Sequence, residues 1–240
     1  MTIEDEEIKK IYNSIDTIWS KEDSWHFYTF NRIQQFIKKE FHNLNLGYDF
    51  SLLNAGSAGN DYGISCKKHI HMDLIEKKII DKEDYLIGSI NDIPLENQEL
   101  DFILCVGSVI NYTDALQSIQ EFSRVLKKDG YLILEFENSY SLEYFLTENF
   151  KKTANIVTTF YKNKEEKVWI YSYKFLEDSL KLNNFKILKS KKFHILSSLI
   201  YRFSKNEKFS TKFSFFDSFL SRIPLVKDYS SNVILLCKKV

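Results

Sequence analysis

The sequence predicts an α/β fold with an open, mostly parallel sheet, and three features of residues 51–136 carry this prediction. The first is a buried apolar strand, Leu52–Ala55, that runs into a loop with glycines at positions 56, 59 and 63. The second is a helical spacing of apolar residues between Thr113 and Lys127, with Thr113 as the expected N-cap. The third is a series of further short strands, one of them with its exit loop, at His69–Asp73, Tyr85–Pro94, Asp101–Gly107 and Tyr131–Phe136.

The glycine-rich loop and the acid after it suggest a nucleotide-like cofactor. Glycine lets the backbone approach a ligand and adopt positive φ. A strand that enters such a loop presents N–H groups at the edge of an α/β sheet. Alone, a glycine-rich loop with this spacing is more often only a turn than a cofactor site. Asp73, at the end of the next predicted strand, strengthens the prediction because a carboxylate there can accept both ribose hydroxyls.

In this order and spacing, the chain resembles the class I S-adenosylmethionine-dependent methyltransferases over roughly residues 45–140. The segments that carry the resemblance are Leu53–Gly59, Asp73, Asn91–Pro94, Asp101–Val106 and Glu121–Glu135. The order of these segments is far more specific than any one of them.

The resemblance implies a Rossmann-like, seven-stranded, mostly parallel sheet with an antiparallel edge strand and helices on both faces. It implies S-adenosyl-L-methionine as cofactor, with Asp73 on the ribose, the Gly56 loop near the methionine part, and Ser89 and Ile90 beside the adenine. The cofactor-binding residues predicted in this way are Asn54, Ala55, Gly56, Ser57, Gly59, Asp73, Leu74, Ser89, Ile90, Val106, Gly107 and Ser108.

The loop departs from the family pattern at several positions. Asn54 stands where an acid is usual, Ala58 where a glycine is usual, and Ser89 where an acid is common. The interval from Gly59 to His69 also leaves little room for the usual first helix. These departures keep open a non-catalytic binding module on the same fold. A nicotinamide-dependent oxidoreductase would share the loop and Asp73, but the lead-in to the fifth strand, residues 124–130, favours the methyltransferase.

Composition narrows the function further. The 240 residues are 44% hydrophobic, enough for one sizeable core, and 33 basic residues balance 33 acidic ones. This balance argues against a nucleic-acid partner and, with the aromatic caps described below, favours a small-molecule acceptor of natural-product, sugar or lipid-like type. Three isolated cysteines lack metal-ligand spacing, which predicts no metal site and a cytoplasmic protein. No apolar run approaches the ~18 residues of a membrane span.

Residues 1–44 are predicted to form a helical cap, with a helix over Tyr28–Phe41. An aromatic cluster, Trp25–Tyr28, precedes this helix. It is either a hydrophobic clasp or a lid that excludes water from the cofactor. His26 is the one titratable group in the cluster, and it is either a general base or a structural histidine.

Residues 106–112 follow the fourth strand and are expected to face the ligand. Gly107 and Ser108 should lie near the cofactor. Asn111 and Tyr112 either reach the cofactor or acceptor, or cap and pack the following helix. The candidate acceptor-binding residues are therefore Trp25, His26, Tyr28, Asn111 and Tyr112, with His26 and Tyr112 as weak catalytic candidates and no base assigned.

Residues 45–240 are predicted to form the methyltransferase domain, and its second half is richer in antiparallel elements. The elements expected there are a helix at Ser141–Asn149, a hairpin of Ile156–Tyr161 and Val168–Tyr173 bridged by Lys162–Lys167, a helix around Phe175–Leu182, and strands at Phe185–Phe193 and Asn232–Lys238.

Between the last two strands lies an insertion, residues 194–231, that the core fold does not need. Lys186–Lys212 holds eight Lys or Arg against one acid, Glu207, with phenylalanines interleaved or following. Such a stretch suits contact with a membrane surface by residues 194–219 or with an anionic or lipid-like acceptor. We expect instead a helical lid with a solvated basic face, whose aromatic residues are buried. The acceptor atom and the oligomeric state are not predicted.

Overall fold

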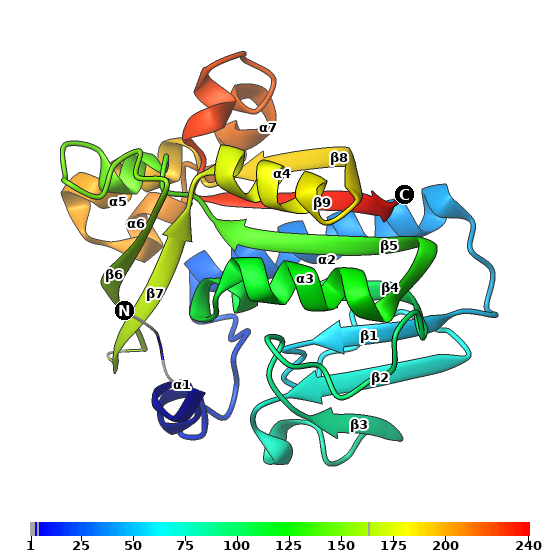
Figure 1. Cartoon of the computed structure of the whole chain (residues 1–240). Helices are drawn as coiled ribbons and strands as arrows, with labels where there is room; N and C mark the ends of the chain where they lie inside the picture. The colour runs from blue at the N-terminus through cyan, green and yellow to red at the C-terminus, as the bar shows by residue number, and fades with distance from the viewer. Residues whose placement is uncertain (1–2, 4, 163) are drawn as a thin grey trace.

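A seven-stranded sheet forms the centre of the molecule (Figure 1). The computed structural model describes residues 3, 5–162 and 164–240. The strand order is β3-β2-β1-β4-β5-β9-β8; β1 to β5 are parallel, and β9 pairs antiparallel with both β5 and the edge strand β8. The strands are β1 Ser51–Ala55, β2 Lys68–Asp73, β3 Asp84–Ile87, β4 Leu100–Cys105, β5 Leu126–Glu137, β8 Phe185–Phe193 and β9 Asn232–Lys239. The predicted fold class is confirmed.

Helices cover both faces of this sheet. In Figure 1, α2 (Ser24–Leu44) lies behind it, and α3 (Ala115–Val125) and α4 (Tyr173–Leu182) lie in front. Ile33 and Ile37 of α2 are fully buried against β1 and β4, and Phe122 of α3 is fully buried on the other face. Burial of each such side chain contributes about 1.5–3 kcal/mol to the stability of the fold. The helical spacing of apolar residues in the sequence therefore predicted the positions of these helices correctly.

Three local predictions were wrong. The N-cap of α3 is Asp114, whose Oδ1 accepts N–H bonds from the first turn, whereas Thr113 turns its hydroxyl to the Ile110 carbonyl. The expected helix over residues 141–149 is a single 3₁₀ turn, Leu142–Tyr144, because Leu146 takes a left-handed conformation at φ 61°. The bridge of the hairpin is shorter than expected, since the second strand begins at Lys164.

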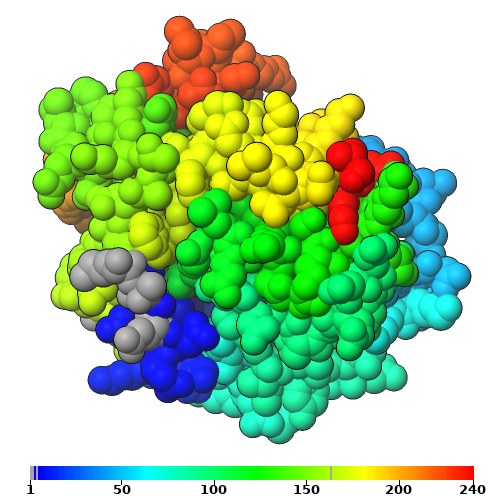
Figure 2. All heavy atoms as spheres, in the orientation of Figure 1, coloured from blue at the N-terminus to red at the C-terminus, as the bar shows by residue number. Residues whose placement is uncertain are grey.

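The hairpin forms a sheet of its own, from β6 (Ala154–Tyr161) and β7 (Lys164–Tyr171). It gathers with α1 (Asp5–Tyr12), α5 (Leu196–Ser204) and α6 (Glu207–Thr211) beyond the carboxyl ends of the parallel strands (Figure 1). In Figure 2, α1 lies at the surface below the hairpin. The remaining short elements are α7 Asp217–Leu220 and 3₁₀ turns at Glu76–Lys78, Val109–Tyr112, Ser214–Phe216 and Val226–Tyr229.

The links between elements also match the sequence. Residues 56–67, all described, contain turns and no helix, as the short interval after Gly59 predicted. The insertion between β8 and β9 is helical throughout its regular parts. Within the described residues, every helix is too short or too polar to cross a bilayer.

Candidate active site

A large cavity opens at the carboxyl ends of β1, β2 and β4, where the cap elements meet the sheet. One half is lined by the loops after these strands. The other half is lined by α1, the start of α2, the hairpin and the insertion. The predicted cofactor residues that line it are Gly56, Ser57, Asp73, Leu74, Ser89, Ile90, Val106, Gly107 and Ser108. The cavity therefore joins the predicted cofactor loops to a second chamber.

The loop after β1 has the shape that the glycines predicted. Gly56 lies at φ 71°, and a Cβ there would come within 2.5 Å of the Val109 side chain. Gly59 lies at φ 79°, and a Cβ there would come within 2.4 Å of the Lys78 carbonyl. Neither position has room for a side chain. Gly56 and the Val109 side chain thus pack closely together on the wall of the cavity.

Asp73 lies on that wall and is fixed by backbone donors. Its Oδ2 accepts a bond of 2.9 Å from the Ala58 N–H, and its Oδ1 accepts one of 3.0 Å from the Ile75 N–H. Burial raises the pKa of this carboxyl, while the N–H bonds act against the shift. Each carboxylate oxygen keeps a second acceptor position for a ligand hydroxyl.

Three predicted cofactor residues lie outside the cavity lining. Asn54 is buried and its Nδ2 donates to the Asn60 carbonyl, so it ties the loop to β1. Ala55 is buried within β1, and Gly59 lies in the turn behind the wall. Sequence reasoning missed a second support of the loop, because His71 Nδ1 lies 3.1 Å from Ser57 Oγ, which accepts from Gly59 N–H. No local pattern marks a strand histidine for this task.

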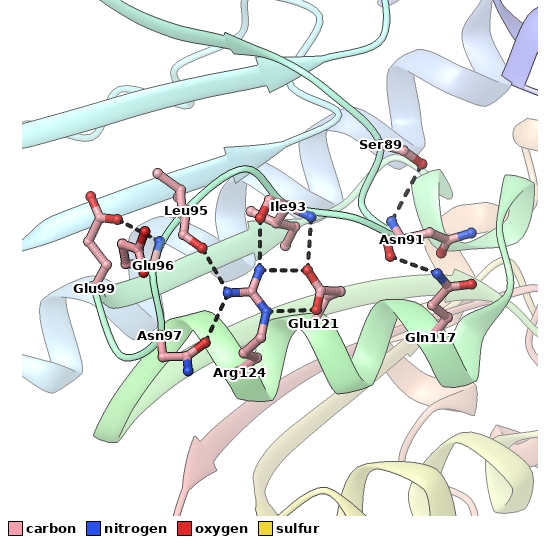
Figure 3. Close-up of polar contacts among 10 residues, drawn as sticks. All are labelled: Ser89, Asn91, Ile93, Leu95, Glu96, Asn97, Glu99, Gln117, Glu121 and Arg124. Atoms are coloured by element: carbon pink, nitrogen blue, oxygen red, sulfur yellow. Dashed lines mark hydrogen bonds and ion pairs between the residues drawn. The ribbon is translucent and has the colours of Figure 1, made fainter.

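The loop after β3, which carries Ser89 and Ile90, is held by α3 (Figure 3). The Arg124 guanidinium donates to the Ile93 carbonyl at 2.8 Å and to the Leu95 carbonyl at 2.7 Å. It also pairs with Glu121, whose carboxylate accepts the Ile93 N–H at 2.9 Å. One arginine thus fixes both the backbone of the loop and the acid that holds it.

A buried acid supports the loop after β4. Glu135 Oε2 accepts the N–H groups of Gly107 at 2.9 Å and Ser108 at 2.7 Å, and Asn232 donates to its other oxygen. Burial raises the pKa of Glu135, and these three donors oppose the shift. Glu135 therefore holds the shape of the predicted cofactor wall and is not itself part of the lining.

The second chamber is built around tyrosines and carboxyl groups from distant segments. Tyr112 donates to Glu166 Oε2 at 2.9 Å, and its hydroxyl lies 2.6 Å from that of Tyr12. Burial raises the pKa of both tyrosines well above the ordinary value. Both hydroxyls therefore keep their protons at neutral pH, and Tyr112 acts as a donor to Glu166.

Three further carboxyl groups face the same chamber, from Glu137 at the end of β5, Glu143 and Glu207. Burial, followed by the neighbouring carboxyl groups, raises the pKa of Glu137 to about 8. Burial raises the pKa of Glu143 to about 7. These two acids can hold or release a proton near neutral pH, and no local sequence pattern predicted either of them.

The aromatic cluster of the cap divides between the cavity and the core. Trp25 and His26 line the chamber, and His26 Nδ1 lies 2.8 Å from Asp23 Oδ2. Tyr28 turns away, and its hydroxyl donates to Asp217 and to the Ser214 carbonyl. Asn111 is fully buried and hydrogen-bonds the backbone of Glu137 and Trp169. Asn111 and Tyr28 thus have structural partners.

The N-terminal segment crosses directly over the cofactor wall. The Trp19 ring lies so close to Gly107 that a Cβ there would come within 3.1 Å of it. Lys77 and Lys78 donate to the carbonyls of Asn13 and Ile15. This segment therefore limits access of water to the cavity.

Among the described residues, one set of side chains is close enough to share a metal ion, and it consists of Asp23, His26 and Glu207. Asp23 already caps α2 through the His26 N–H at 3.1 Å. The absence of a metal site stays a prediction.

Comparisons with known proteins agree with this fold. A family described as "Methyltransferase domain" matches residues 59–134. No curated protein sequence matches the chain. Among solved structures, an S-adenosylmethionine-dependent methyltransferase from Clostridium acetobutylicum ATCC 824 has a TM-score of 0.57 at 17% identity, with 98% of each chain covered. The PH0226 protein from Pyrococcus horikoshii OT3 has a TM-score of 0.59 at 14% identity, covering 98% of this chain and 99% of that one.

A third similar structure shows that the fold alone does not determine the reaction. The [4+2]-cyclase SpnF has a TM-score of 0.55 at 14% identity, covering 87% of this chain and 80% of that one. One scaffold thus carries more than one chemistry. The match of residues 59–134 to the methyltransferase domain spans β2 to β5, so this part of the chain carries a methyltransferase domain within the seven-stranded fold described here.

Proposed function

We propose that this enzyme transfers the methyl group of S-adenosylmethionine to a small-molecule acceptor that carries an O–H or N–H group. The observation that carries the proposal is the single cavity that joins the Asp73 wall to the chamber of Glu137, Glu143 and Tyr112. A donor site and a proton-accepting acceptor site in one cavity are what such a transfer requires.

The residues on the cofactor wall fit the donor. Asp73 offers free acceptor positions for the ribose hydroxyls, and Gly56, which has no side chain of its own, lines the wall where the methionine part would lie. Leu74 and Ile90 give apolar surfaces for the adenine, beside the loop that Arg124 holds. The donor supplies a methyl group on a positively charged sulfur. Asn54 brings no charge to this site and instead holds the loop in shape.

Residues 1–44 serve in this proposal as the lid. Trp19, Trp25 and Tyr12 close the cavity over the loops after β1 and β4. Exclusion of water strengthens every electrostatic contact inside the site and protects the methyl group from hydrolysis. The aromatic cluster is thus both clasp and lid, because Trp25 and His26 border the cavity while Tyr28 packs on the core.

Glu143 is the group we assign to the acceptor proton. Its pKa of about 7 lets its carboxylate accept a proton near neutral pH. Tyr112 is a poor base because burial raises its pKa well above the ordinary value. His26 borders the same chamber, and its Nδ1 is already engaged with Asp23. We therefore place Glu143 before the two candidates that the sequence offered.

Calorimetric titration tests the donor site. We expect S-adenosylmethionine and S-adenosylhomocysteine to bind, NAD to give no heat, and Asp73→Ala to weaken binding about 100-fold, since charge-assisted hydrogen bonds are lost. Asp84→Ala is the matched control, because Asp84 is an exposed acid at the opposite end of the neighbouring strand β3. Absence of binding by the wild type would refute the donor assignment.

A second readout separates donor from acceptor. With a mixture of hydroxyl and amine acceptors, we expect release of S-adenosylhomocysteine, and Glu143→Gln should lower this rate about 100-fold while leaving donor affinity unchanged. Glu148→Gln is the control, since Glu148 is exposed in the same segment. A Glu143→Gln enzyme of full activity would remove Glu143 from the reaction.

A further inference from the structure

The insertion between β8 and β9 exposes the aromatic side chains that the sequence led us to expect inside. Phe203 is 68% exposed, Phe215 70% and Phe219 64%, and Phe209 and Phe216 are also exposed. Leu225, in the same insertion, is 76% exposed. Among the described residues outside the insertion, one phenylalanine, Phe160, is exposed to a similar extent, and it lines the cavity. Exposed apolar side chains gathered on one segment mark an interaction surface.

The acidic and basic residues of the insertion differ in how far they face solvent. Two of its three acids turn inward, since Glu207 faces the cavity and buried Asp217 accepts the N–H groups of His194 and Ile195, while half-exposed Asp228 pairs with Lys192 at 2.6 Å. Its exposed basic residues are Lys205, Lys208, Lys212, Arg222 and Lys227. The outer face is therefore positively charged as well as aromatic.

This outer face lies directly outside the acceptor chamber. In α6, Glu207 lines the cavity while Lys208 and Phe209 point to solvent. In α5, Tyr201 lines the cavity while Phe203 is exposed. Figure 1 shows α5 and α6 beside the hairpin, and Figure 2 shows the part near α7 projecting from the top of the molecule. One thin helical layer thus separates the chamber from this surface.

We propose that residues 203–227, called here the insertion surface, dock on a bilayer that contains anionic lipid. Phenylalanines enter the boundary between headgroups and acyl chains, and lysines bind anionic headgroups, as in other peripheral membrane proteins. The position of α5 and α6 then brings the acceptor chamber to the lipid surface. Amphiphilic acceptors held in the bilayer are the molecules that this arrangement favours.

The charge pattern distinguishes a lipid partner from a second copy of this chain. A two-fold dimer through the insertion surface would place the same patch against itself. Five basic residues would then face five others, while two of the acids face inward and Asp228 is already paired with Lys192. Like charges across an interface are repulsive. An anionic bilayer neutralises the same charges.

Co-sedimentation with vesicles tests the proposal. We expect the whole protein to bind vesicles of phosphatidylcholine with about one-third phosphatidylglycerol, to bind vesicles of phosphatidylcholine alone at least about tenfold more weakly, and to dissociate as salt is raised. Phe215→Ser combined with Phe219→Ser should weaken binding by about tenfold or more. Lys208→Gln with Lys212→Gln should weaken it about 20-fold and reduce its dependence on salt.

Matched controls keep the test decisive. Lys181→Gln with Leu182→Ser changes one exposed lysine and one leucine that is 82% exposed on α4, and vesicle binding should not change. Every variant should bind S-adenosylhomocysteine like the wild type, which separates this result from the donor assignment. The proposal is overturned if anionic vesicles are not bound or if the control weakens binding equally. A dimer that the phenylalanine variants dissociate, without vesicle binding, would assign the surface to a second copy.

Discussion

The two halves of the cavity are built in different ways. On the donor side, the loop after β1 is held by groups near in sequence, as when Asp73 accepts the Ala58 N–H from fifteen residues away. On the acceptor side, Tyr12 meets Tyr112 from a hundred residues away, and Tyr112 meets Glu166 from 54 residues away. The donor wall is mostly backbone held by side chains behind it. The acceptor chamber is made of the side chains themselves.

This difference predicts which half tolerates change. Backbone walls depend on the few side chains that hold them, so one substitution behind the wall should damage donor binding and stability together. Side-chain walls can change their chemistry while the fold remains, because the hairpin and the insertion lie outside the seven-stranded sheet. Variation in the acceptor should therefore reside in residues 138–231 and in α1.

The largest expected effect is on the donor side, at Arg124. Arg124→Leu removes the bonds to the Ile93 and Leu95 carbonyls and leaves Glu121 without its ion-pair partner. We expect the free energy of unfolding to fall by about 3 kcal/mol. Because the loop with Ser89 is released, affinity for S-adenosylhomocysteine should fall as well. Chemical denaturation and calorimetry measure the two effects.

Lys128→Leu is the control for Arg124→Leu, because Lys128 is exposed just beyond the same helix. It should change neither quantity. If Arg124→Leu lowered stability and left donor affinity intact, the loop after β3 would not be part of the donor site.

On the acceptor side, Glu143 should make stability depend on pH. Burial raises its pKa from 4.5 to about 7, so the folded protein keeps a proton that the unfolded chain releases. The unfolded state then binds fewer protons, and the free energy of unfolding falls as pH rises through this window. Glu143→Gln cannot ionise. We expect it to be about 2 kcal/mol more stable than the wild type at about pH 8, and nearly equal at about pH 4.5.

Urea denaturation at the two pH values measures this difference. Glu207 raises the pKa of Glu143 further, while Lys205, His26 and Arg202 lower it, so the variant isolates the net effect of these neighbours. Exposed Glu148→Gln should show no pH-dependent gain. An equal stability of wild type and Glu143→Gln at high pH would contradict the assignment of a raised pKa.

A smaller effect is expected at Tyr112. Tyr112→Phe removes the donor to Glu166 and the contact with the Tyr12 hydroxyl, while the ring still packs. The loss of one such bond costs about 1–1.5 kcal/mol. We expect a higher KM for the acceptor and an unchanged affinity for S-adenosylhomocysteine. Tyr85→Phe on the exposed side of β3 is the control. Equal loss of donor affinity would show that the two halves do not act separately.

The sequence predicted the donor half better than the acceptor half because the donor half depends more on local sequence patterns. Strands, the glycine loop and Asp73 follow from local periodicity and spacing, so the sheet and the place of Gly56 were predictable. The grouping of Glu137, Glu143 and Glu166 follows from folding of distant segments, and no local pattern records it.

The insertion shows a second limit of sequence reasoning. Its helices were expected, but an alternation of lysine and phenylalanine does not say which side of a short helix faces water. Only the packing of Glu207 into the cavity fixed Lys208 and Phe209 on the outer side of α6.

The smallest expected effect is at Ala58, in the loop after β1, where the family that the chain resembles usually has a glycine. Ala58 has φ 44°, a left-handed conformation that costs an L-residue about 1–2 kcal/mol. Ala58→Gly removes this strain but adds about 0.4–1 kcal/mol of unfolded-state entropy, so we expect a net gain of about 0.5 kcal/mol. Ala115→Gly, in the first turn of α3, should instead lose about 0.5–1 kcal/mol. Thermal unfolding resolves the two signs, and destabilisation by Ala58→Gly would mean that the donor loop needs the alanine side chain more than it needs relaxed backbone.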